Sequence, residues 1–407
     1  MASAVGWLHR RLAAILQRQL APAAVRVELW NGSSPYDGPA PVGTLVVHDG
    51  RTLRGLLVNG QLQFGECYMR GTLEVHGPLE PVIEAISWEY TTPTWRERLA
   101  LHLATPRNSV NRARQNVHHH YDLGNDFYSG WLDRQLLYTC AYFEHPDASL
   151  EEAQVAKMEL VCRKLRLQRG ETVVEAGCGW GALALHMARE YGVRVKAFNV
   201  SREQTAYARA RAAREGLSHL VEFIEDDYRN VAGECDVFVS VGMLEHVGLK
   251  HYSSLAAVLG RVLRRSRGRG LLHFIGRDIR RPLNAWIRRR IFPGAYVPTL
   301  AEVATRVLAP PRMSILDVEN LRLHYVRTLA HWSRRFASME DEVRARYSDE
   351  FRRAWELYLA GSEAAFATGS LQLFQVVFAP FETPPPYWTR AEIDTPTKAD
   401  EWHAAMR

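Results

Sequence analysis

The stretch EAGCGWG, residues 175–181, places three glycines between a run of apolar residues and the start of an expected helix. Glycine lets the backbone approach a ligand closely, and it leaves the first N–H groups of the helix free to bind that ligand. The spacing G-x-G-x-G is shorter than the dinucleotide pattern G-x-G-x-x-G. We therefore expect Gly177 and Gly179 to contact a nucleoside rather than to form a simple tight turn. Glu175 would bind the amino group of that ligand, or its carboxylate through water.

Side chains suited to ribose and adenine follow the next two expected strands. A nucleoside needs a partner for its ribose hydroxyls near the end of the second strand, where dinucleotide folds usually offer a carboxylate. Here the chain offers Asn199 and Gln204, whose amides both donate and accept. IEDDYRN then supplies Asp227 and Tyr228 for the edge of an adenine. The pattern resembles the class I S-adenosylmethionine (SAM) methyltransferase fold more than an NAD domain.

Strands and helices that would position these residues alternate from about residue 150 onward. Strand patterns occur at TVVEAG, RVKAFNV, VEFIEDD, CDVFVSVG and GLLHFIG, with helical patterns between them. This alternation predicts an α/β fold, with a mostly parallel sheet and helices on both faces. Near the end, YSDEFRRAWELYLAGSEAAFATG predicts a helix, and LQLFQVVFA predicts a return to the sheet.

Residues 1–105 have a different pattern and predict a small α+β domain. Strands are expected at VRVELWNG, TLVVHD, LRGLLVN, LQFGECYM and GTLEVHG, and a helix at LEPVIEAIS. Polar residues 106–116 would link this domain to a catalytic domain at 117–390, and 391–407 would form a C-terminal tail. A first helix would cover a domain face or lie on a membrane. Its apolar residues at helical spacing are Val5, Leu8, Leu12, Ile15 and Leu16.

Composition excludes several classes of protein. Among 407 residues, 47% are hydrophobic and 24% charged, as in ordinary globular proteins, and no 18-residue apolar run predicts a membrane span. Arginines interrupt the apolar pattern of the N-terminus, so we expect a cytosolic protein without a signal peptide. The five cysteines form no CxxC motif, which argues against a zinc knuckle. Arginines concentrated in 261–290 predict a solvated face or contacts to phosphates, and no nucleic-acid-binding motif accompanies them.

Eight further motifs occur in an order and spacing that carry a specific resemblance. They include HHYDLGNDFY (119–128), LLYTCAYF (136–143), AQVAKMELVCRKLRL (153–167), EAGCGWG, VSVGMLEHVG (239–248), LLHFIG, IFPG and LQLFQVVF. Over residues 115–380 the chain resembles the cyclopropane-fatty-acyl-phospholipid synthases and the related mycolic acid cyclopropane synthases and methyltransferases. GLLVNGQLQFGECYMRGTLE is similar to the lipid-binding domain of the phospholipid-acting members.

The resemblance implies transfer of a methylene from SAM to the cis double bond of an acyl chain in a membrane phospholipid. The alkene attacks the methyl group on the sulfonium, and a base then removes a proton from the transferred methyl so that a cyclopropane ring closes. The site must stabilise a carbocation and exclude the water that would trap it. Aromatic faces do both without reacting. The aromatic residues that crowd these motifs are Tyr121, Phe127, Tyr128, Trp131, Tyr138, Tyr142 and Phe143.

In the resembling family the base is a bound bicarbonate. Its ligands correspond to Cys140, Glu245, His273, the main chain of Ile275, and Tyr325. Glu245 follows one expected strand, and His273 lies at the carboxyl end of the next, where open α/β sheets bind ligands. His273 would donate to bicarbonate while Glu245 accepts its proton. The resemblance also implies a set of SAM contacts, namely Tyr138, Thr139, Gly177, Gly179, Asn199, Ser201, Gln204, Asp227 and Tyr228.

Three consecutive histidines, 118–120, raise the alternative of a metal site. Adjacent side chains point apart in a helix or strand, and no set of acids or cysteines completes such a site, so we expect no metal. His119 and His120 instead precede Tyr121, which the resemblance places near the reacting methyl. The stretch would then form a lid over the SAM methyl.

Two alternatives stay open at this point. Related proteins make methyl-branched or methylene fatty acids, or methylate a small amine. Ser362 stands where family members commonly have cysteine, which leaves a non-catalytic lipid-binding or SAM-sensing protein as another candidate. The expected partners are phospholipid acyl chains and an anionic membrane surface, with a homodimer as a further candidate and no nucleic acid. We expect a cytoplasmic protein associated peripherally with the inner face of the membrane.

Overall fold

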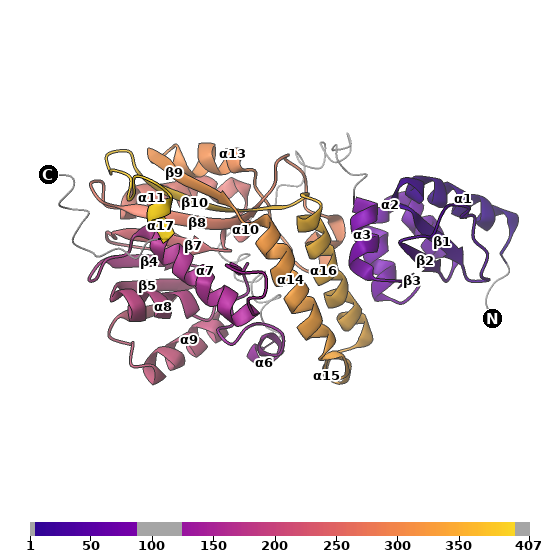
Figure 1. The fold of residues 1–407 in the computed structure, drawn as a ribbon, viewed down its shortest axis with the longest axis horizontal. Coiled ribbons are helices and arrows are strands. Elements are labelled where there is room, and N and C mark those ends of the chain that lie inside the picture. The colour runs from indigo at the N-terminus through magenta and orange to yellow at the C-terminus, as the bar shows by residue number, and fades with distance from the viewer. Residues whose placement is uncertain (1–4, 88–123, 395–407) are drawn as a thin grey trace. The chain divides into compact units, whose positions relative to one another are not determined.

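The computed structural model describes residues 5–87 and 124–394 of the chain. These residues belong to two compact units, each described by itself below (Figure 1). One unit combines the N-terminal residues with 281–293 and 325–371, and the other holds the remainder. The predicted linker at 106–116 lies outside the described residues, so the domain boundaries stay a prediction.

A seven-stranded sheet forms the centre of the second unit (Figure 1). Its strand order is β6-β5-β4-β7-β8-β10-β9, and β10 alone of these seven runs antiparallel to its neighbours. This confirms the predicted α/β fold with a mostly parallel sheet, including the late strand. The strands are β4 (Thr172–Ala176), β5 (Arg194–Asn199), β6 (Val221–Glu225), β7 (Val237–Val241), β8 (Arg269–Gly276), β9 (Met313–Asn320) and β10 (Gln372–Pro380).

Helices cover the sheet, and local sequence explains where they begin. The longest, α7 (Leu150–Leu165), starts at a capping box in which Ser149 and Glu152 satisfy each other's backbone N–H groups. It ends at Arg166, which adopts the left-handed conformation. The others in this unit are α6 (Asn125–Ser129), α8 (Ala182–Tyr191), α9 (Arg202–Arg214), α10 (Leu244–Val247), α11 (Tyr252–Val262), α13 (Leu300–Val303) and α17 (Ala391–Asp394), with short turns η2 (Tyr228–Asn230), η3 (Leu249–His251) and η4 (Ala304–Leu308).

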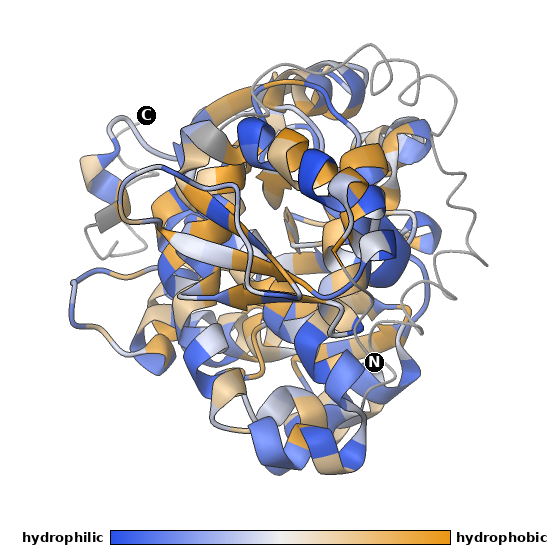
Figure 2. Cartoon of the chain, turned by 90° about the vertical axis from the view of Figure 1, so that its right-hand side faces the viewer, coloured by the Kyte–Doolittle hydropathy of each residue, from blue (hydrophilic) through white to orange (hydrophobic). Residues whose placement is uncertain are grey.

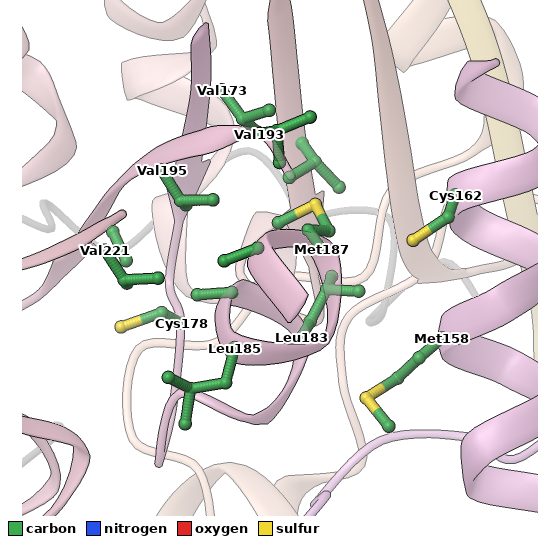
Figure 3. Close-up of a cluster of buried hydrophobic side chains, with 14 of the residues drawn as sticks. Met158, Cys162, Val173, Cys178, Leu183, Leu185, Met187, Val193, Val195 and Val221 are labelled. Carbon is green, nitrogen blue, oxygen red and sulfur yellow. The ribbon is translucent and has the colours of Figure 1, made fainter. Parts of the chain in front are cut away.

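Two apolar cores lie on the two faces of this sheet, because successive strand side chains point to opposite faces. Val173 belongs to one core and its neighbour Val174 to the other. Figure 3 shows the first core, in which α8 side chains such as Met187 lie between valines of the sheet and Met158 of α7. In Figure 2 the helices carry both hydrophobic and hydrophilic residues, as expected for elements with one face toward a core.

The first unit contains a three-stranded sheet of order β1-β2-β3 and corrects two sequence predictions. The segments LRGLLVN and LQFGECYM are not strands, because both lie in α2 (Gly50–Met69). Asp49 caps this helix by accepting from Thr52 N–H, and Leu53 and Leu56 are buried one turn apart. The other elements of the N-terminal part are α1 (Trp7–Leu20), η1 (Ala21–Ala23), β1 (Val25–Leu29), β2 (Gly43–Val47), β3 (Leu73–His76) and α3 (Leu79–Ser87).

Later segments complete the first unit. The predicted late helix is confirmed as α16 (Asp349–Ala367), which packs against α2 and α3. The unit also holds α12 (Ala285–Arg290), α15 (Glu340–Arg346) and the part of α14 (Arg322–Ala337) from Tyr325 onward. Within residues 5–87 and 124–394, no helix is both long and apolar enough to span a membrane.

The arginines of 261–290 do not form one uniform solvated face. Arg264 and Arg267 pair with Asp236, and buried Arg269 forms a bidentate pair with Glu171 at 2.8 and 2.9 Å. In the other unit, the Arg290 guanidinium donates to both carboxylate oxygens of Glu66 at 2.7 Å. Much of this positive charge is therefore neutralised within the protein, and the arginine run by itself supports little binding to phosphates.

Candidate active site

A pocket opens at the carboxyl ends of β4, β5 and β7 in the second unit, with a cavity volume of about 160 Å³. The strand order reverses between β4 and β7, and open α/β sheets bind ligands outside such a switch point. Of the ten predicted SAM-contacting residues, Ser201 does not line the pocket. The nine that do are Tyr138, Thr139, Glu175, Gly177, Gly179, Asn199, Gln204, Asp227 and Tyr228.

The three glycines of the turn have different roles in the geometry. All have positive φ, and a side chain at Gly181 would lie 2.6 Å from the Phe223 ring, so this glycine lets α8 pack closely. At Gly177 a side chain would meet Met243 at 2.9 Å. A Cβ at Gly179 would meet no atom within 4 Å, which leaves open space above the backbone. The turn thus combines tight packing below with an open approach for a ligand above.

The amides that follow β5 are held by one another. Asn199 Nδ2 donates to Gly179 O at 3.0 Å and to Gln204 Oε1 at 2.9 Å, while Asn199 Oδ1 accepts from Ser201 N–H. Ser201 is the N-cap of α9, and its hydroxyl accepts from the Gln204 N–H. Asn199 therefore shapes the glycine turn as well as lining the pocket, whereas Ser201 supports the helix behind it.

An ion pair that the sequence did not single out borders the predicted adenine edge. Arg229 donates to both carboxylate oxygens of Asp227 at 2.7 Å, and its guanidinium lies 5.7 Å from the centre of the Tyr228 ring. This pair raises the pKa of Arg229. Asp226 and Arg229 also line the pocket. The signal was available, because an arginine follows the DDY triplet directly in the sequence.

A buried lysine faces Glu175 in the same pocket, and the sequence analysis missed it too. Lys157 on α7 is 1% exposed, and its Nζ donates to Thr139 Oγ1 at 2.9 Å. Burial lowers its pKa to about 8, while the negative charges of Asp133, Cys140 and Glu175 oppose that shift. Burial likewise raises the pKa of Glu175 to about 8, and Lys157 opposes this. A lysine on the apolar face of AQVAKMELV was the overlooked signal.

Glu245, His273 and the main chain of Ile275 come together at the ends of β7 and β8, and we refer to them as the Glu245–His273 group. The Ile275 N–H donates to Glu245 Oε1 at 2.5 Å, and β8 residue His273 accepts from Gly242 N–H through its carbonyl. Burial raises the pKa of Glu245 to about 7. Burial and the charges of Lys157 and Lys164 hold the pKa of His273 well below its usual range. Glu245 Oε2 and His273 Nε2 are buried and lack a hydrogen-bond partner among the described residues.

The remaining predicted catalytic residues lie in three places. Cys140 is fully buried in the second unit and contributes to the electrostatic environment of Lys157. Tyr325 belongs to the first unit, where its ring packs 4.5 Å from Phe366 and 5.9 Å from Trp332. Tyr121 lies outside the described residues. The roles of all these residues, and of the pocket residues above, stay predictions.

Aromatic rings cluster behind the pocket. The Tyr128 ring lies 5.6 Å from Tyr138 and 5.2 Å from Trp180, and both of those residues line the pocket. Trp131 contacts Tyr138 edge to face at 5.2 Å. The Trp180 indole donates to Asn125 at 2.7 Å, which ties α6 to the glycine turn. In the described part of the chain, no cluster of three or more histidine, cysteine or acidic side chains is arranged to hold a metal.

Comparison with known proteins identifies the family. Residues 108–376 match the family model described as mycolic acid cyclopropane synthetase. The chain belongs to this family. It is 36% identical to the cyclopropane-fatty-acyl-phospholipid synthase of Escherichia coli K12, over 86% of this chain and 89% of that one. A probable fatty acid methyltransferase of Pseudomonas putida is 33% identical, over 88% of this chain and 94% of that protein.

Solved structures agree with this assignment. The cyclopropane synthase MmaA2 from Mycobacterium tuberculosis superposes with a TM-score of 0.62 and 31% identity, covering 65% of this chain and 98% of that one. The family is one of cyclopropane synthases and methyltransferases, so the chain is an enzyme of this class with the class I SAM methyltransferase fold. Residues 12–92 match a separate model, described as a domain of unknown function, DUF7884.

Proposed function

We propose that this enzyme transfers a methylene from SAM to the cis double bond of unsaturated acyl chains in membrane phospholipids, forming a cyclopropane ring. The observation that carries the proposal is the pair of buried atoms, Glu245 Oε2 and His273 Nε2, that lack partners among the described residues. Buried polar atoms are costly without a partner. Such a pair suits a small anion that accepts from His273 and shares a proton with Glu245.

The pocket residues fit SAM as the methylene source. Open space above Gly179 admits a ligand against the backbone, and Asp227 and Tyr228 offer a polar and an aromatic edge for an adenine. Glu175 Oε2 is buried with no hydrogen-bond partner in the described chain, so it suits the amino group of the ligand. When bound, SAM supplies a methyl group on a sulfonium. This protein's residues would orient that methyl and keep water away.

The Glu245–His273 group fits bicarbonate as the base. Bicarbonate would supply a mild base within a closed site. Glu245, with its pKa raised to about 7 by burial, can hold or release a proton near neutral pH through Oε2. The Ile275 N–H fixes the carboxyl group by binding Oε1, so Oε2 keeps one direction. Cys140, the Ile275 main chain and Tyr325 complete the proposed ligand set.

The aromatic cluster supports a cationic reaction. Tyr128, Tyr138 and Trp180 pack with ring centres 5.2 to 5.6 Å apart, and Tyr128 is fully buried. Ring faces stabilise a neighbouring positive charge and cannot capture it as water does. The alkene carbon bonds to the transferred methyl, the positive charge forms on the other alkene carbon, and loss of a methyl proton closes the ring.

Helix α1 supports the proposal of peripheral membrane association. Trp7, Leu8 and Ile15 are 70%, 56% and 41% exposed, so this helix leaves apolar side chains uncovered in its own unit. It carries three arginines and a histidine but no acidic residue. The Arg11 guanidinium lies 5.2 Å above the Trp7 ring. Exposed tryptophan and arginine on an amphipathic helix suit the interface of an anionic lipid surface, here the inner face of the cytoplasmic membrane.

A second candidate product is a methyl-branched or methylene fatty acid. It is favoured by the similarity to the probable fatty acid methyltransferase of Pseudomonas putida and, at 32% identity, to the tuberculostearic acid methyltransferase UfaA1 of Mycobacterium tuberculosis. Both outcomes begin with the same methyl transfer. They differ in the proton that is lost or the hydride that is gained afterwards, so the base site decides between them.

Product analysis tests the proposal. Purified enzyme is incubated with SAM and anionic vesicles that contain one cis-unsaturated phospholipid, and the lipids are extracted for mass spectrometry and NMR. We expect a product one CH2 heavier with the proton resonances of a cis-cyclopropane. An exocyclic alkene or a methyl branch would favour the second candidate. Absence of any lipid product alongside tight binding of S-adenosylhomocysteine would instead indicate a non-catalytic protein.

A further inference from the structure

A buried row of side chains connects His273 to ion pairs on α7. In the register of the sheet, Gln375 on β10 lies directly opposite His273 on β8 and directly opposite Glu319 on β9. Side chains in such positions share one face of the sheet and interact. Lys164 of α7 reaches the same row, and its Nζ lies 2.8 Å from Gln375 Oε1 and 2.5 Å from Glu319 Oε2. His273, Gln375 and Lys164 are each at most 2% exposed.

The ion pairs of Lys164 determine the orientation of the Gln375 amide. An ammonium group donates three hydrogen bonds and accepts none. Burial lowers the pKa of Lys164, but the carboxylates of Glu319 and Asp317, at 2.5 and 3.9 Å, oppose that shift and favour the charged form. The oxygen of the Gln375 amide must therefore face Lys164. Its NH2 group must face His273 Nδ1, which lies 3.2 Å away.

We propose that Gln375, oriented by Lys164, is a positioning residue that keeps His273 in the neutral tautomer with its proton on Nε2. A nitrogen that accepts from an amide cannot carry a proton itself, so Nδ1 presents its lone pair and Nε2 bears the hydrogen. The surroundings of His273 also disfavour the imidazolium, because two lysines lie near a fully buried ring. The row of side chains thus converts a residue with two forms into a fixed donor.

This inference rests on the proposed function for its consequence. Nε2 is the ring atom without a partner among the described residues, and it would donate to an oxygen of the bound anion. The other tautomer would present a lone pair to that oxygen and repel it. His273 would accordingly bind and orient the base, while the proton is taken up elsewhere in the Glu245–His273 group.

Nitrogen NMR tests the tautomer without lipid or SAM. Protein labelled with 15N-histidine is examined by long-range proton–nitrogen correlation, and the His273 signals are assigned by their loss in His273→Gln. In the wild type we expect Nε2 in the range of a protonated nitrogen and Nδ1 in that of an acceptor. Gln375→Glu places an acceptor-only carboxylate between Lys164 and His273, so we expect Nδ1 to become protonated. Glu319→Gln is the matched control, because Lys164 still faces two side-chain oxygens and the wild-type tautomer should remain.

Several results would overturn the proposal. A wild-type protein with its proton on Nδ1 does so without any variant, which protects the test against a variant that fails to fold. A folded Gln375→Glu protein that retains the wild-type tautomer does so as well. In an active enzyme we expect Gln375→Glu to lower kcat about 10²–10³-fold, the typical effect of losing one oriented donor, while S-adenosylhomocysteine binding is unchanged. Failure of the lipid assay with the expected tautomers would contradict the proposed function alone.

Discussion

The nucleoside pocket and the Glu245–His273 group lie at the carboxyl ends of the same sheet, yet their polar atoms are used differently. In the pocket, most polar side chains already bind each other, as Asn199 does with Gln204 and Asp227 with Arg229. In the Glu245–His273 group, one polar atom of each side chain is held by the protein, and the other has no partner among the described residues. The pocket is therefore preorganised as a shape, whereas the group is preorganised to bind an additional small polar species.

The largest effect should come from removing the proton acceptor of the group. We expect Glu245→Gln to lower kcat for lipid product by about 10²–10³-fold, because an amide binds the Ile275 N–H but cannot take up a proton. Binding of S-adenosylhomocysteine, measured by calorimetry, should be unchanged. Glu159→Gln on α7 is a matched control, since Glu159 pairs with His186 and Tyr191 and lies outside the pocket lining. Normal ring formation by Glu245→Gln would contradict the proposed base site.

Charge reversal on α1 tests a surface far from either set of buried atoms in the chain sequence. Each basic residue near an anionic membrane contributes about 1 kcal/mol, so we expect the double variant Arg11→Glu and Arg18→Glu to weaken vesicle binding more than tenfold. Co-sedimentation with anionic vesicles measures this, and vesicles of neutral lipid provide the control. Unchanged binding to anionic vesicles would show that membrane contact uses another surface.

Two neighbouring residues in the chain distinguish lining the pocket from supporting it. Asp227→Asn should weaken S-adenosylhomocysteine binding about tenfold, as expected for losing one charged hydrogen bond near a ligand. Ser201→Ala removes the cap of α9 and should lower the free energy of unfolding by about 1 kcal/mol with little change in that affinity. Calorimetry and denaturant unfolding give the two values. The reverse pattern, with Ser201→Ala losing affinity, would make Ser201 a ligand contact.

The smallest predicted effect concerns the pH dependence of stability. The pKa of Glu175 is raised to about 8, so between its ordinary value of 4.5 and 8 the folded protein holds a proton that the unfolded chain has released. Stability from this residue therefore falls as pH rises through that window. Glu175→Gln should remove a decline of at most about 1.4 kcal/mol per pH unit. Denaturant unfolding from pH 5 to 8 measures the slope, and identical slopes for both proteins would contradict the raised pKa.

Residues close together in the chain were the ones that sequence patterns could identify. The glycine turn, the amides after β5 and the DDY triplet each belong to one strand end, and parallel strands bring such ends together. The alternation of strand and helix patterns likewise predicted the sheet. These predictions rest on local rules that the folded chain obeys.

Long-range pairing explains what the sequence analysis missed. Gln375 faces His273 only because β10 inserts between β8 and β9 with a particular register, and no local pattern encodes that register. Lys157 is buried because Thr139 and several acids surround it, although lysine is usually exposed. The two strands predicted within α2 failed because Asn59 interrupts the helical backbone and hides its periodicity.

Dependence of turnover on bicarbonate tests the central claim most directly, that the Glu245–His273 group holds a small anion as the base. Cyclopropane formation from unsaturated phospholipid vesicles is measured in buffer depleted of carbon dioxide and then with added bicarbonate. We expect turnover to fall on depletion and to return in a saturable manner, with no such recovery in Glu245→Gln. Full wild-type turnover in depleted buffer, unaffected by added bicarbonate, would contradict the claim.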